Sequence, residues 1–318
     1  MKFITNKYFV LAGAVIACSI WGSVLVVIKF GYIALNIAPD EFWMQVMFAS
    51  YRFLLAGFII IFLYSVFGRK IIINKAFVYH TIVLAVTATT VKYMFMYYGL
   101  GHTTGVKASI TASTLVIWNI VLAAVFIRGD RITFSKIIGV FLGFSGVIIT
   151  NLKDLGNPGS VEDSLLGVFL IFLTQMMSSI SHIYIKKIKG DVQIIPLTGA
   201  HMIAGALILM LPASLKVGLF PFTFNTMGAV SLIYLAFAGA IAFSLWNTIM
   251  RHNILGNISV YFFIIPVSGT ILSTLILKES LSVYAVIGLL LVSLSIFVVN
   301  FRDKKQDEVY SKDEEFIA

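Results

Sequence analysis

Two basic residues stand inside long apolar stretches of this sequence, where a charge is costly. They are Arg52 and Lys92. A charged side chain at membrane depth usually faces a protein interior or an aqueous cavity, and it marks a functional site by default. Lys92 is expected to line a cavity and to favour a ligand that carries a carboxylate or another anionic group. The alternative is a structural lysine that snorkels or is held by carbonyls. For Arg52, a cavity role and a structural pairing with Asp40, Glu41 or backbone carbonyls both stay open.

A second polar group lies on one face of the apolar stretch 165–187. Its members follow each other at i, i+4, i+7 and i+11, and they are Gln175, Ser179, His182 and Lys186. Polar side chains that share one face of an apolar helix are expected to look inward. They either contact a ligand or join neighbouring helices, because hydroxyl and amide groups do both in membranes. His182 is also a candidate proton site.

Aromatic residues with hydrogen-bonding neighbours complete the candidate site and suit an amphipathic ligand. Aromatic residues near the ends of apolar stretches otherwise form an interfacial belt, which fits Tyr8 and Trp43. The predicted substrate-binding set is Trp21, Lys92, Tyr97, Trp118, Asn119, Gln175, His182, Trp246, Asn247 and Tyr261.

Pro266 interrupts a later apolar stretch. Proline removes a helix hydrogen bond and kinks the helix, so Pro266 is predicted to be a gating hinge, although such kinks are also ordinary architecture. Beyond it, Glu279 precedes the expected N-cap Ser282, as Asp130 precedes Thr133. An acid there meets the positive end of the following helix, which is a structural role.

The composition places these residues in a membrane. The chain has 59% hydrophobic and 12% charged residues, whereas soluble domains carry about 25% charged residues. The formal charge of +9 is spread over the breaks between apolar stretches, which argues against nucleic-acid binding. Catalytic motifs such as HExxH, GxSxG and the Walker loop are absent, and Cys18 is the single cysteine. We therefore expect no metal, no cofactor and no enzymatic activity.

The apolar stretches predict an all-α, polytopic membrane protein with ten transmembrane helices, since about 17 to 25 apolar residues cross a bilayer. The expected spans are 8–30, 44–67, 76–100, 104–127, 134–151, 165–187, 194–216, 226–250, 254–277 and 281–301. The longest connection, 152–164, divides the chain into 1–151 and 165–301, and 302–318 forms a tail.

Lysine and arginine counts predict the orientation, because short basic loops stay cytoplasmic. With both termini inside, sixteen of the 23 lie on the inner side. Apart from Arg52 and Lys92, the rest form the outer set of Lys29, Lys107, Lys153, Lys216 and Lys278. The expected location is the plasma (inner) membrane, with both termini and the tail 302–318 cytoplasmic and 152–164 outside.

The two halves resemble each other at an offset of 149 positions. The matching pairs are Asp130 with Glu279, Ile132 with Leu281, Thr133 with Ser282, and Gly139 with Gly288. Halves of five spans each must lie in opposite orientations, because five is odd. The sequence therefore predicts two inverted five-helix repeats, an architecture that exposes a central site alternately to each side.

Several short motifs in a fixed order resemble the EamA-type, ten-helix branch of the drug/metabolite transporter superfamily over residues 8–301. They are Trp21-Gly22, Arg52-Phe53, Tyr98-Gly99-Leu100, Thr103-Thr104, Ala108, the break Lys278-Glu279-Ser280-Leu281, and Gly288. The chain departs from that pattern at Ile117, where the family has proline, and at Gly129-Asp130. The resemblance implies a cavity lined by spans one, three, four, six, eight and nine, with spans five and ten as scaffold.

These observations predict a secondary active transporter that exports a small amphipathic metabolite, such as an amino acid, by alternating access. The expected partners are this substrate, membrane lipids and a coupling proton, with no nucleic acid, in a monomer or homodimer. One alternative is a membrane-embedded enzyme acting on a lipid-soluble substrate, for which His80, His182 and His201 would need acidic or nucleophilic partners. A receptor or scaffold that transports nothing is the third.

Overall fold

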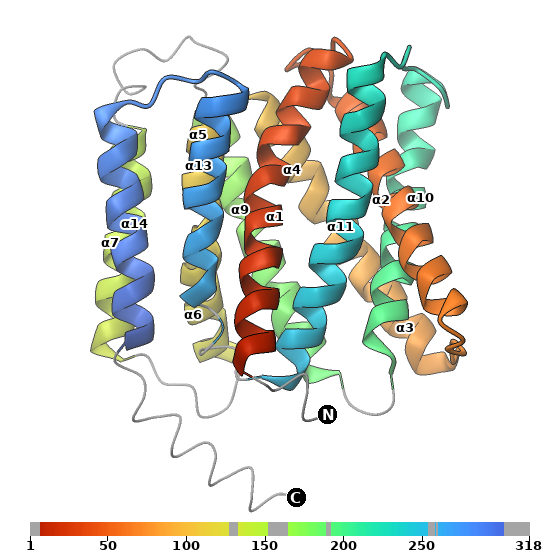
Figure 1. Cartoon of the computed structure of the whole chain (residues 1–318), viewed down its shortest axis with the longest axis horizontal. Coiled ribbons are helices and arrows are strands. Elements are labelled where there is room, and N and C mark those ends of the chain that lie inside the picture. Colours follow the sequence, from red (N-terminus) through yellow and green to blue (C-terminus); the bar gives the residue numbers. More distant parts are fainter. Residues whose placement is uncertain are drawn as a thin grey trace, which may run out of the picture.

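The computed structural model describes residues 7–126, 133–151, 165–188, 192–253, 258 and 260–301, and these residues form helices without any β-strand. The helices stand side by side in one bundle (Figure 1). The first half contains α1 (Lys7–Ala34), α2 (Phe42–Val66), α3 (Lys75–Leu84), η1 (Ala85–Val91), α4 (Lys92–Gly101), α5 (Gly105–Ala112), α6 (Thr114–Phe126) and α7 (Phe134–Thr150). The second half contains α9 (Leu165–Lys187), α10 (Ile194–Val217), α11 (Thr226–His252), η3 (Val260–Phe263), α13 (Ile264–Ile276) and α14 (Val283–Phe301).

Six helical stretches are long and apolar enough to cross a membrane. They are Tyr8–Ala34, Phe42–Val66, Gly105–Leu122, Leu165–Lys187, Ile194–Val217 and Thr226–His252. Shorter apolar helices cover Phe134–Thr150, Tyr261–Ile276 and Val283–Val298. The chain is therefore a multi-pass, all-helical membrane protein.

Three of the expected spans are interrupted. The expected span 76–100 changes from α3 to the π-helical segment η1 and then to α4, which starts at Lys92. The span that starts near Gly105 breaks at Ser113, whose N–H donates to Ile110 O at 3.2 Å. In the ninth stretch, the 3₁₀ segment η3 precedes α13, so Pro266 lies in the first turn of α13. Proline is tolerated in a first turn because its missing N–H would have no partner there.

The packing separates a paired edge from a central group. α7 and α14 lie along each other at one edge of the bundle (left in Figure 1). Glycine permits their close approach, because a Cβ on Gly146 would stand only 2.8 Å from Gly288 O. α1 packs between α11 and α13, α4 packs against α9, and α2 runs along α10. This arrangement leaves the middle of the bundle to α1, α4, α9 and α11.

α1 begins and α14 ends at the same end of the bundle, and the connections α1–α2, α4–α5, α10–α11 and α13–α14 lie at the opposite end (Figure 1). There Glu279 accepts hydrogen bonds from Gly105 N at 2.8 Å and Val106 N at 2.9 Å, and its Oε1 lies 3.8 Å from Lys29 Nζ. Lys29 also donates to Thr103 O. We call Lys29, Thr103, Gly105, Val106 and Glu279 the end cluster.

The expected helix caps are partly as predicted. Thr133 and Ser282 are confirmed as N-caps, since their hydroxyls accept from Lys136 N at 3.3 Å and Ala285 N at 3.1 Å. Glu279 does lie at a helix N-terminus, but at that of α5 and not at that of the helix following it. The free N–H groups of α5 bind its carboxylate together with Lys29, which joins the two halves. Asp130 lies outside the described residues.

Candidate functional site

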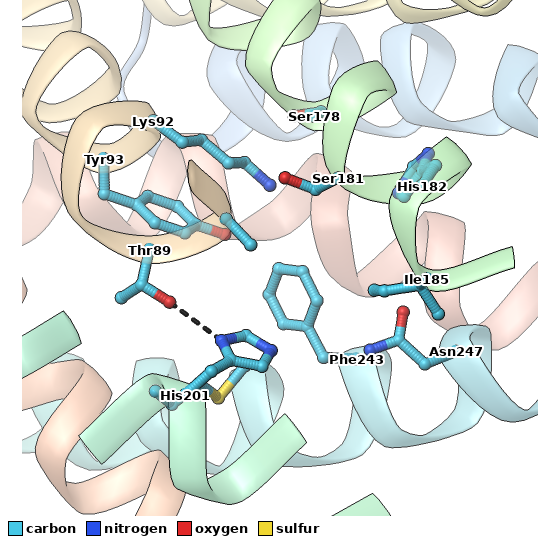
Figure 2. Close-up of a pocket in the computed structure, with 12 residues that line it drawn as sticks. Thr89, Lys92, Tyr93, Ser178, Ser181, His182, Ile185, His201, Phe243 and Asn247 are labelled. Carbon is cyan, nitrogen blue, oxygen red and sulfur yellow. Dashed lines mark hydrogen bonds between the residues drawn. The ribbon is translucent and has the colours of Figure 1, made fainter. Parts of the chain in front are cut away.

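Two adjoining cavities lie in the middle of the bundle, between helices of both halves. The larger has a volume of about 60 Å³ and is lined by residues of α1, α2, α4, α5, α6, α9, α11 and α13. The smaller, of about 20 Å³, is lined by residues of η1, α4, α9, α10 and α11 (Figure 2). Both are lined by Lys92, Tyr93, Ser178, His182 and Phe243. A cavity needs roughly 10–15 Å³ to hold one water molecule, so these two cavities have room for only a few waters.

Lys92 stands where the two cavities meet. It is the first residue of α4, directly after the π-helical segment η1, and such segments often occur at functional sites. Its side chain is 9% exposed and its Nζ lies 4.8 Å from the centre of the Tyr93 ring and 5.2 Å from that of Phe243. Figure 2 shows its ammonium pointing between α9 and Phe243. Within the described residues its Nζ has no hydrogen-bond acceptor.

Arg52 lines the larger cavity from α2 and is completely buried. Its Nη1 donates to Tyr97 Oη at 3.1 Å and its Nε donates to Leu235 O at 3.2 Å. Its guanidinium also lies 4.8 Å from the centre of the Phe53 ring. Both interpretations of Arg52 therefore apply in part. It lines the cavity, and it also pairs with a backbone carbonyl. Neither Asp40 nor Glu41 is its partner.

Aromatic rings form one wall of the larger cavity. Trp21 lies edge-on to Phe243 and to Trp246, each with ring centres 5.4 Å apart, and Phe262 packs against Trp246 at 4.5 Å. The indole Nε1 atoms of Trp21 and Trp246 are buried without a hydrogen-bond partner. An unpaired buried donor is costly in an apolar environment, so the Trp21 Nε1–H, which lines the cavity, is suited to a ligand acceptor.

α9 supplies the polar face opposite. Thr174, Gln175 and Ser178 line the larger cavity, and Ser178 and Ser181 line the smaller one. Ser178 and Ser181 both donate to the carbonyl four residues before them at 2.9 Å, which leaves their oxygen lone pairs available. His182 lines both cavities, and its Nδ1 is buried without a partner.

Two other polar side chains of the smaller cavity, His201 and Asn247, are hydrogen-bonded within the protein. His201 Nδ1 and Thr89 Oγ1 are hydrogen-bonded at 3.0 Å (Figure 2). Asn247 Nδ2 donates to Thr198 Oγ1 at 3.0 Å.

His80, the third histidine of the enzyme alternative, lines neither cavity, and its Nδ1 bonds the Tyr184 hydroxyl at 2.7 Å. In the part of the chain that the structure describes, none of the three histidines of the enzyme alternative bonds a carboxylate, and no metal-binding group of His, Cys, Asp and Glu occurs.

The structure brings together about half of the predicted substrate-binding residues. The cavities are lined by Trp21, Lys92, Gln175, His182 and Asn247. Two more lie directly behind them: Tyr97 binds Arg52, and Trp246 packs on Trp21.

The remaining three predicted residues also line neither cavity. Trp118 donates its Nε1–H to Phe172 O at 3.2 Å, away from the cavities. Asn119 is buried with both side-chain polar atoms unpartnered, and Tyr261 packs half-buried against the core. The predicted hinge Pro266 follows the lining residue Ile265.

The sequence prediction missed several lining residues. Phe243 and Tyr93 look like ordinary core aromatics in a sequence, whereas Arg52 carried a usable signal, its charge in an apolar span. The lining helices also differ from those implied by the resemblance, because α2 and α10 contribute Arg52 and His201. None of the described residues of α7 and α14 lines either of these two cavities.

Comparison with known proteins identifies the family. A family model described as the EamA-like transporter family matches the chain twice, over residues 9–152 and 165–301. The chain belongs to the EamA-like transporter family. The family predicted from the sequence motifs is thereby confirmed, and the cavities lie between helices of the two matched segments.

Related proteins with similar sequences are named as transporters. The chain is 24% identical to an uncharacterized transporter of Archaeoglobus fulgidus over 302 residues, which are 92% of this chain and 98% of that protein. It is 26% identical over 267 residues to the uncharacterized transporter YetK of Bacillus subtilis, covering 83% and 80%. A solved structure described as "Crystal structure of protein" superposes with a TM-score of 0.66 at 14% identity, covering 93% of this chain and 99% of that one. That likeness supports the fold alone.

Proposed function

We propose that this membrane transporter is a secondary active exporter of a small amphipathic metabolite, of the size of an amino acid, working by alternating access. The observation that carries the proposal is the buried pair of cavities between the two halves, with Lys92 at their junction. Binding sites of such transporters lie at the midplane between repeats. Here aromatic rings offer an apolar wall, and α9 offers hydroxyl and amide groups.

We propose that the chain crosses the membrane ten times, as two inverted repeats of five helices. Pairs of contacts between the halves support this arrangement. Under the 149-residue offset, α1 corresponds to α9 and α4 corresponds to α11. The repeat symmetry therefore converts the contact of α1 with α11 into the contact of α9 with α4, and both contacts occur. The contacts of α2 with α10 and of α7 with α14 each map onto themselves.

We propose that both termini face the cytoplasm of a cell whose plasma (inner) membrane holds the protein. Lys29, Lys107, Lys216 and Lys278 fall at the end of the bundle opposite the start of α1, and sparse positive charge favours the outer side. A reporter fused after Ala318 is expected to read as cytoplasmic. An external signal would contradict this orientation.

The cavities are too small for an amino acid-sized substrate, so transport requires the helices to move apart. Three breaks lie beside the cavities: η1, the turn at Ser113, and η3 with Pro266. Such breaks allow a helix to change direction at a low cost, and we propose Pro266 as the hinge of the ninth span. The driving force is the gradient of the substrate or of a coupled proton, with His182 as the candidate proton site.

Counterflow tests the transport function directly. The purified protein is screened by thermal shift against amino acids, amines, nucleosides and small acids, and each stabilising compound is tested in proteoliposomes preloaded with the same compound. Radiolabelled compound is expected to accumulate inside, and protein-free liposomes are the control. If no stabilising compound shows counterflow, the proposed function is contradicted. An imposed pH gradient that accelerates uptake would indicate proton coupling.

A further inference from the structure

The spans of this protein contain positive charges but no acidic residue. All fourteen Asp and Glu residues of the sequence lie in the connections or the tail. Three of them are described: Asp40 and Glu41 are exposed between α1 and α2, and Glu279 belongs to the end cluster. Within the described residues, neither Arg52 nor Lys92 forms an ion pair with a carboxylate.

The partners that these cations do have are neutral. Arg52 binds a tyrosine hydroxyl and a backbone carbonyl, and no described residue bonds its Nη2. Lys92 Nζ lies over the faces of two aromatic rings, and no described residue accepts a hydrogen bond from it. Ring faces stabilise an ammonium only weakly compared with water, and two cations that line one cavity repel each other. The empty site is thus short of negative charge.

Two of the donors at the larger cavity are charged, whereas its acceptors are all neutral. Lys92 offers its ammonium, Arg52 its Nη2, and Trp21 an Nε1–H that is buried without an acceptor. The acceptors are the hydroxyls of Thr174 and Ser178, the amide oxygen of Gln175 and one ring nitrogen of neutral His182, none of which is charged. A ligand with two or more acceptor oxygens and a negative charge satisfies these donors.

We propose that the substrate is an organic carboxylate that carries no ammonium group, such as a 2-hydroxy acid, and not a zwitterionic amino acid. Its carboxylate lies between Lys92 and Arg52, and its apolar body lies against Trp21 and Phe243. An amino acid would bring an ammonium group into a cavity that already holds two cations and no carboxylate. The inference rests on the proposed transport function and narrows its substrate class.

Matched pairs of compounds test this selectivity in the wild-type protein. Lactate and alanine, 2-hydroxyisocaproate and leucine, and 3-phenyllactate and phenylalanine differ only in a hydroxyl against an ammonium group. Counterflow in proteoliposomes is measured for each compound, with phenethylamine as a cation. In at least one pair the hydroxy acid is expected to be favoured by about tenfold or more, the value of a charged hydrogen bond.

Different outcomes contradict the proposed substrate class and the proposed transport function. If compounds exchange but the hydroxy acid is favoured in none of the pairs, or if only a neutral or cationic compound exchanges, the substrate class is wrong and the transport function stands. If no compound of the pairs or of the wider screen exchanges, the transport function itself is contradicted, and the inference falls with it.

Two variants then test the role of Lys92. Lys92→Gln is expected to reduce counterflow of the hydroxy acid by about 10- to 100-fold, as expected for a charged hydrogen bond, and Lys92→Arg is expected to retain part of it. Lys216→Gln is the matched control, because Lys216 is exposed at the end of α10, and it should transport like the wild type. Unchanged counterflow in a folded Lys92→Gln protein would overturn the assignment.

Discussion

Lys29 and Lys92 are two lysines with opposite surroundings. At the end of the bundle, Lys29 lies 3.8 Å from the Glu279 carboxylate and donates to Thr103 O, and that carboxylate also accepts two N–H groups of α5. In the centre, Lys92 is more deeply buried, lies over two aromatic rings, and shares its cavity with another cation and with no described carboxylate.

The difference separates structural charge from functional charge. A buried charge whose partners are all in the protein stabilises the fold once it has formed, and removing one partner is costly. A buried charge without a partner destabilises the empty protein, and it is retained because something else binds it. The end cluster joins two halves of the bundle, whereas the central cations stand ready for a ligand.

Removing Glu279 is expected to have the largest effect on stability. Glu279→Ala leaves two N–H groups of α5 without their acceptor and removes the carboxylate beside Lys29, which costs roughly 1.5–3 kcal/mol for a charged hydrogen bond. The apparent Tm in detergent should fall by roughly 3–10 °C.

Asp40→Ala is the matched control, because Asp40 is an exposed acid between α1 and α2. Its Tm should equal that of the wild type. Equal Tm values for both variants would show that the end cluster contributes nothing to the fold.

Trp21→Phe tests whether the unpaired indole N–H in the centre of the bundle binds the ligand. It removes a buried donor that has no partner in the protein and keeps an aromatic ring against Phe243. Binding of the transported compound, measured by thermal shift or counterflow, should weaken by roughly 2- to 10-fold, the value of one neutral hydrogen bond. The Tm of the empty protein should not fall. A lower Tm with unchanged transport would assign Trp21 to packing only.

Trp118→Phe should have the smallest effect. Trp118 gives its Nε1–H to Phe172 O outside the cavities, so the loss is limited to roughly 0.5–1.5 kcal/mol of stability. Counterflow of the reconstituted variant should match that of the wild type. Reduced counterflow at equal protein amounts would place Trp118 in the transport path after all.

Much of the fold is readable from the sequence, because apolar length and polar breaks are local signals. The helices follow the predicted stretches closely, and Thr133 and Ser282 cap helices as expected. A kink was predicted only at Pro266, and the interruptions at η1 and Ser113 were not predicted, since η1 has no proline or glycine that would indicate it. The destination of Glu279 was missed for a related reason: its partners at Gly105 and Val106 are 174 and 173 positions away.

The candidate site was predictable where chemistry is unusual for its place. Lys92, Gln175 and His182 stand out as polar residues in apolar spans, and they line the cavities. Trp118 and Tyr261 do not stand out in this way, because an aromatic residue serves equally in a core, a belt or a binding wall. Which face of a helix looks inward depends on the tertiary packing, and the π-helical turn before Lys92 changes that face further.

The same substitution at both lysines tests the central claim most directly. The apparent Tm of the ligand-free protein is measured for Lys29→Met and Lys92→Met. Lys29→Met should lower the Tm, because Glu279 loses its cation, whereas Lys92→Met should leave it unchanged or raise it, because an unpaired buried charge is removed. A Lys92→Met protein destabilised as much as Lys29→Met would contradict the view that Lys92 waits for a ligand.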